Sequence, residues 1–160
     1  MYTYRLENLP LYIPFGHAAL YARTFSFAKH AVVQKNRTSI TKLFAFIVIG
    51  LATVYFIFLN DVFGLLMTVG VFILLLKRPK DRVFFLTMYI IVAVLEIGGT
   101  AYSTWAWPST AFNKFQYLPS NNPPSGISLF YFLLDIGCFV CYKLFNPNVW
   151  KRYKSVYSTT

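Results

Sequence analysis

The chain has 160 residues, of which 57% are hydrophobic and only 12% are charged. Soluble domains carry about 25% charged residues, so this composition excludes an ordinary soluble domain. The formal net charge of +10 does not indicate nucleic-acid binding, because the basic residues flank apolar segments and form no separate basic face. We therefore expect a single integral membrane domain over residues 1–160, with membrane lipids as partners and no nucleic acid.

The apolar segments predict an all-α fold, a polytopic transmembrane helical bundle of about five spans. The spans are expected at about residues 10–28, 43–59, 62–76, 83–103 and 128–145, with an outer loop over 104–127. Residues 43–76 are divided in two because one helix over this stretch would be about 51 Å long, against a hydrocarbon core of about 30 Å. The division falls at Asn60 and Asp61. Asp61 is expected to be a solvated turn residue.

The positions of the basic residues predict the orientation. Most of the fifteen Lys and Arg residues fall at one set of span ends, which the positive-inside rule assigns to the cytoplasm. The N-terminus is then outside and the C-terminus cytoplasmic. A four-span alternative stays open, in which residues 10–28 lie in the interface, because this segment has a borderline length for crossing. The expected location is a bacterial inner (plasma) membrane.

Three ionisable side chains lie inside the predicted spans at a similar depth. His17, Glu96 and Asp135 are each about seven residues from the outer end of their span, which is roughly 10 Å of helix. Charged groups in hydrocarbon are costly, so an acid within a membrane span is a candidate functional residue. We predict that these three residues share a polar pocket in the outer half of the bilayer. They are the predicted catalytic groups, for proton transfer or polar capture.

Further polar and aromatic residues are predicted to bind a substrate beside this pocket. Tyr and Thr residues share the helix faces of the two acids, because offsets of three, four or seven residues lie on one face. Two Trp residues of the outer loop suit the membrane interface. The predicted substrate-binding residues are Tyr89, Thr100, Tyr131, Trp105 and Trp107. The competing interpretation is structural, since hydrogen bonds between membrane helices contribute about 0.6–2 kcal/mol.

Two functions of different classes follow from these residues. In the first, the chain is a small integral membrane protein that acts on or binds a small amphiphilic or lipid-like molecule in the His/Glu/Asp pocket; whether it is an enzyme stays open. In the alternative, it is a non-catalytic helical subunit of a larger membrane protein complex, with other membrane subunits as partners.

One imidazole and two acids can also bind a divalent cation. No metal is predicted, because no span has metal-ligand spacing such as HExxH, and no cofactor is assigned.

Overall fold

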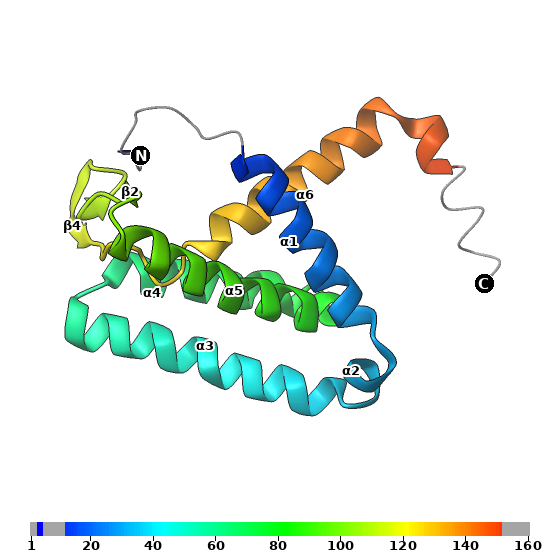
Figure 1. The fold of residues 1–160 in the computed structure, drawn as a ribbon, viewed down its shortest axis with the longest axis horizontal. Coiled ribbons are helices and arrows are strands. Elements are labelled where there is room, and N and C mark those ends of the chain that lie inside the picture. Colours follow the sequence, from blue (N-terminus) through cyan, green and yellow to red (C-terminus); the bar gives the residue numbers. More distant parts are fainter. Residues whose placement is uncertain (1–2, 5–11, 152–160) are drawn as a thin grey trace. The chain divides into compact units, whose positions relative to one another are not determined.

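The structure is a computed structural model that describes residues 3–4 and 12–151 (Figure 1). The helices are α1 (Tyr12–Lys29), α2 (Ala31–Lys35), α3 (Arg37–Leu59), α4 (Val62–Leu76), the single-turn 3₁₀ helix η1 (Pro79–Asp81), α5 (Arg82–Ala101) and α6 (Ser128–Phe145). Four short strands, β1 (Thr3–Tyr4), β2 (Trp105–Ala106), β3 (Thr110–Ala111) and β4 (Phe115–Pro119), form two antiparallel pairs, β1 with β2 and β3 with β4. The predicted helical fold is therefore correct, whereas the strands of the outer loop were not predicted.

Among the described residues, three helical segments are long and apolar enough to cross a membrane: Arg37–Leu59, Pro79–Ala101 and Ser128–Phe145. By length and composition they are the helices of an integral membrane protein. The fourth apolar helix, α4, has 15 residues. The predicted bounds 62–76 and 128–145 agree with α4 and α6. Residues 10 and 11 of the predicted first span lie outside the described residues.

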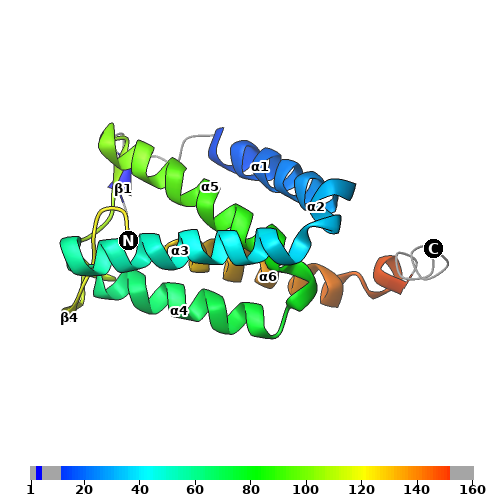
Figure 2. The ribbon, with the colours of Figure 1, turned by 90° about the horizontal axis from the view of Figure 1, so that it is seen from below.

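The break between α3 and α4 has a local cause. Asn60 has φ 53°, in the left-handed region, which Asn adopts more readily than most residues with a side chain. This conformation ends α3, and the backbone N–H of Asp61 bonds back to the carbonyl of Tyr55 at 3.2 Å. The chain then reverses, so that α3 and α4 lie side by side (Figure 2).

Two compact units divide the chain, residues 1–129 and 130–160. In the first, α3 packs against both α4 and α5, and α1 packs against α5. The buried core of this unit includes Val48, Val71, Leu86 and Met88. In the second unit, the ring of Trp150 meets Phe139 edge to face, with 5.1 Å between ring centroids.

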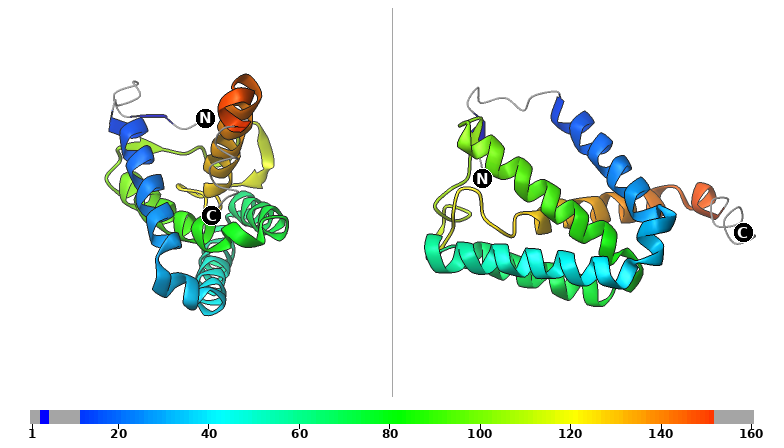
Figure 3. Two further views of the ribbon diagram at one scale, coloured as in Figure 1. Left: turned by 90° about the vertical axis from the view of Figure 1, so that its right-hand side faces the viewer. Right: turned by 60° about the horizontal axis from the view of Figure 1, so that its bottom comes forward.

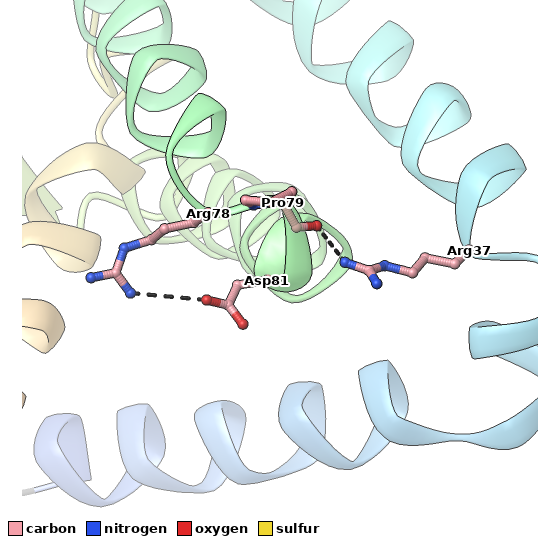
Figure 4. A network of polar contacts seen from close by, with 4 residues as sticks. All are labelled: Arg37, Arg78, Pro79 and Asp81. Atoms are coloured by element: carbon pink, nitrogen blue, oxygen red, sulfur yellow. Dashed lines mark hydrogen bonds and ion pairs between the residues drawn. The ribbon is translucent and has the colours of Figure 1, made fainter.

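The basic ends of α3 and α5 are joined by a contact over the η1 turn. The helix α3 begins at Arg37, six residues before the predicted span, after α1 and α2 have led the chain to this end (Figure 3). The guanidinium of Arg37 donates to the backbone carbonyl of Pro79, and Arg78 lies 3.9 Å from Asp81 (Figure 4). Polar residues thus extend α3 beyond its apolar part and meet the turn that starts α5.

Candidate functional site

A buried carboxylate lies near the end of α5. Glu96 is only 4% exposed, and its Oε2 accepts hydrogen bonds from two indoles of the following loop. The Nε1 of Trp105 is 2.8 Å away and the Nε1 of Trp107 is 2.9 Å away. Residues two apart in an extended segment point to the same side, which brings both indoles to one oxygen. Hydrogen bonds to a charged acceptor are stronger than neutral ones, so Glu96 fixes the start of the loop.

The close approach of Trp105 to α5 requires a glycine. Gly99 is three residues after Glu96, on the same face of the helix. A Cβ added at Gly99 would lie 2.1 Å from the Cζ2 of Trp105, which is far inside van der Waals contact. The six-membered ring of the indole therefore rests on the backbone of α5 while its N–H reaches the carboxylate.

A second carboxylate fixes the end of the same loop. Asp61 is fully buried, at 0% exposure, so the predicted solvated turn residue is wrong. Its Oδ1 accepts from the backbone N–H groups of Gly64 at 3.1 Å and Asn121 at 3.0 Å, and its Oδ2 accepts from that of Ser125 at 2.7 Å. The bond to Gly64 is an N-cap of α4, which satisfies one of the free N–H groups of the first turn. The other two bonds hold a segment about 60 residues further along the chain.

Tyr89 ties the loop to the middle of the bundle. Its hydroxyl donates to the carbonyl of Ser125 at 2.7 Å and lies 2.8 Å from the Oγ1 of Thr68. The ring is completely buried. Helices α4 and α5 and the loop therefore meet at one phenol group. This polar cluster consists of Asp61, Thr68, Tyr89 and Ser125.

The remaining predicted site residues lie on three helices. His17 is half-buried on α1, and Asp135 and Tyr131 are half-buried on α6. On α5, the hydroxyl of Thr100 donates to the backbone carbonyl of Glu96 at 2.7 Å. Asp135 and Tyr131 belong to the second compact unit and the other residues to the first. The shared pocket of His17, Glu96 and Asp135 stays a prediction.

Of the predicted residues, the structure brings Trp105 and Trp107 to the carboxylate of Glu96 and Thr100 to its backbone carbonyl. Within the described part of the chain, no group of three or more His, Cys, Asp or Glu side chains is arranged to hold a metal ion. The Glu96 group combines a carboxylate with two indole rings. Such a group can accept a proton, or attract a polar or cationic headgroup by charge and by its aromatic faces.

Sequence reasoning missed the role of Asp61. The available signal was local, because an Asp directly before an apolar helical run is a typical N-cap. The partners Asn121 and Ser125 have no such signal, since their positions depend on how the loop returns to α4.

No protein family, curated protein or solved structure matches the chain.

Proposed function

We propose that the chain is an integral membrane protein that binds, or acts on, a small amphiphilic or lipid-like molecule beside Glu96. The observation that supports this proposal is a carboxylate 4% exposed, within a segment apolar and long enough to span a membrane, that contacts two indole N–H groups. An acid at such a position is costly and is rarely kept without a task. The indole rings provide apolar surface for a chain or ring, and the carboxylate provides a polar end.

In this proposal the roles follow the chemistry of each side chain. Glu96 takes a proton from the bound molecule or attracts its polar headgroup, and Trp105 and Trp107 orient the carboxylate and contact the apolar part. His17 of α1 and Asp135 of α6 are proposed as further proton-transfer groups. Thr100 and Tyr131 are proposed to orient the molecule directly. Tyr89 is proposed to orient it through the loop, because its ring is completely buried and its hydroxyl bonds to Ser125.

The test compares acid variants by the molecules that co-purify with the protein. Glu96→Gln keeps an oxygen that can accept from the indoles, so it removes the charge while the loop attachment stays. The purified wild-type protein in mild detergent is expected to carry a defined amphiphile, identified by mass spectrometry of its organic extract. Glu96→Gln is expected to lose most of it, at least about tenfold, because a buried charged contact contributes more than about 1.4 kcal/mol.

The matched control is Asp81→Asn, which removes an exposed carboxylate at the other end of α5. It is expected to carry the same amphiphile as the wild type. Circular dichroism and the melting temperature check that each variant is folded. If folded Glu96→Gln protein keeps its full amount of bound amphiphile, the proposed binding function is wrong. The variants Asp135→Asn and His17→Ala test the two remaining proposed groups in the same way.

The alternative, a helical subunit of a larger assembly, is supported by the exposed apolar surface of α3. Large side chains along this helix are exposed, namely Phe46, Ile49, Val54, Ile57 and Phe58. Lipid or another membrane protein can cover such a surface. Stoichiometric co-purification of a second protein from mild detergent would favour this alternative over the binding function. A protein that runs alone and carries an amphiphile would contradict it.

A further inference from the structure

A small hairpin in the loop carries a row of exposed aromatic side chains. Strands β3 and β4 pair in an antiparallel manner, and their connecting turn is closed by the backbone N–H of Lys114 on the carbonyl of Ala111 at 3.1 Å. Phe112 is 51% exposed, Phe115 is 40% exposed and Tyr117 is 74% exposed. Neighbouring rings in the row meet edge to face, with centroid distances of 6.2 Å between Phe112 and Phe115 and 5.7 Å between Phe115 and Tyr117.

The backbone of the turn puts Phe112 in an unusual conformation. Phe112 has φ 55° and Asn113 has φ 57°, both in the left-handed region. Asn accepts this conformation easily, but a residue such as Phe pays about 1–2 kcal/mol for it. Contact of the Phe112 ring with water provides no free energy that offsets this strain. The strain is consistent with a ring that has an apolar environment in the working protein.

The hairpin continues an apolar stripe of α4. Phe112 meets Phe63, in the first turn of α4, with 5.5 Å between centroids. From Phe63 the exposed residues Leu66 and Ile73 follow at helical spacing on the same face. Figures 1 and 2 show β4 at the end of the first unit where α4 begins. The aromatic row therefore extends the apolar surface of α4 beyond its first residue.

The length of α4 explains why such an extension is needed. Its 15 residues make a helix of about 22 Å, shorter than a hydrocarbon core of about 30 Å. A short apolar helix leaves a mismatch with the bilayer that costs free energy for each ångström. Aromatic side chains suit the boundary between hydrocarbon and headgroups. The indole N–H groups of Trp105 and Trp107 bond to Glu96, and the place of these residues at the interface stays a prediction.

We propose that the hairpin of residues 110–119 inserts its aromatic row into the headgroup and acyl boundary of the bilayer, at the end of α4 where Asp61 lies. The proposed occupant of this surface is phospholipid, because the surface is continuous with the exposed apolar stripe of α4. Lys114 at the turn is exposed and reaches the phosphate layer while the rings contact the acyl chains. The aromatic row thereby extends the apolar surface at the end of α4, where the helix is too short to cover the hydrocarbon core.

The test measures the depth of two neighbouring hairpin positions in vesicles. Tyr117→Cys places a label in the aromatic row, and Gln116→Cys is the matched control, because adjacent residues of a strand point to opposite faces. Both are made with Cys138→Ser and Cys141→Ser, which remove the two exposed native thiols. Each variant receives the fluorophore NBD and is reconstituted in phosphatidylcholine vesicles, with or without a nitroxide near the headgroup end of the acyl chain.

The label at position 117 is expected to emit at shorter wavelength than the label at 116. It is also expected to be quenched at least about twofold more strongly by the nitroxide lipid, whose depth matches the roughly 5–10 Å insertion of interfacial segments. Equal quenching at the two positions in folded protein would overturn the proposal. Shielding of position 117 in native membranes but not in pure lipid vesicles would show a protein at this surface and would equally overturn it.

Discussion

The carboxylate of Asp61 accepts a hydrogen bond from the backbone N–H of Ser125, 64 residues further along the chain, at 2.7 Å. The same side chain caps α4 through Gly64. One carboxylate therefore both starts a helix and fastens a loop. Because it is fully buried, each of these bonds is shielded from water, and none of the donors has an easy substitute if the carboxylate is changed.

Replacing Asp61 should destabilise the fold strongly. Asp61→Asn keeps only one acceptor oxygen for three backbone donors and turns an N–H group toward at least one of them. We expect the free energy of unfolding to fall by about 2–4 kcal/mol, since buried hydrogen bonds to charged groups contribute about 1.5–3 kcal/mol each. Reversible unfolding in mixed micelles measures the change. Asp81→Asn, at an exposed pair, should change it by less than about 0.5 kcal/mol, and equal effects would contradict the prediction.

Gly64 should not tolerate a methyl group. A Cβ added there would lie 1.9 Å from the Oδ2 of Asp61 and 2.5 Å from the Oγ of Ser125. Gly64→Ala must therefore push the loop or the carboxylate away, at an expected cost of about 1–3 kcal/mol. Gly50→Ala is the control, because nothing lies within 4 Å of an added Cβ on this α3 residue. The control should be neutral or slightly stabilising in the same unfolding assay, as Ala favours helix over Gly.

The two indoles on Glu96 should act together. Trp105→Phe or Trp107→Phe removes one donor, and each should lower the free energy of unfolding by about 1.5–3 kcal/mol. The double variant should cost more than the sum, because the buried carboxylate then lacks both indole donors. A double-mutant cycle measures this coupling. Trp150→Phe, in the second unit, is the control. Additive effects of Trp105→Phe and Trp107→Phe would argue against a shared acceptor.

The phenol of Tyr89 should stabilise the junction of α4, α5 and the loop. Tyr89→Phe keeps the ring but removes the partner of the Ser125 carbonyl and of Thr68. We expect a loss of about 1–2 kcal/mol in the free energy of unfolding. Hydrogen exchange should also rise in the segment around Ser125. Tyr142→Phe, at an exposed phenol of α6, should leave both measurements unchanged within about 0.5 kcal/mol.

The sequence was sufficient to predict the five longer helices, but not α2 and η1, because apolar segments are a local signal. The break at Asn60 and Asp61 followed from comparing the apolar length with the bilayer thickness, and the structure ends α3 at Leu59. The buried position of Glu96 was also expected from its place in an apolar run. Composition likewise predicted an integral membrane protein, in agreement with the three candidate spans.

The contacts of the loop were beyond sequence reasoning because they join distant residues. Nothing near Asp61 shows that Asn121 and Ser125 will return to it. Trp105 and Trp107 have an amphipathic side chain that suits an interface as well as a buried carboxylate. Only the fold of the loop shows that both indoles reach Glu96. Local hydropathy cannot distinguish a turn open to water from one covered by another segment.

The loop between α5 and α6 is fastened near both ends, at Glu96 through two indoles and at Asp61 through two backbone amides. A flap that swings about a single hinge needs one free end, and this segment has none. In the proposed binding function, we therefore expect an amphiphile to reach Glu96 from the acyl chains and not by opening of the whole loop. Uptake should then depend on how readily the guest partitions into lipid, and not on its concentration in water.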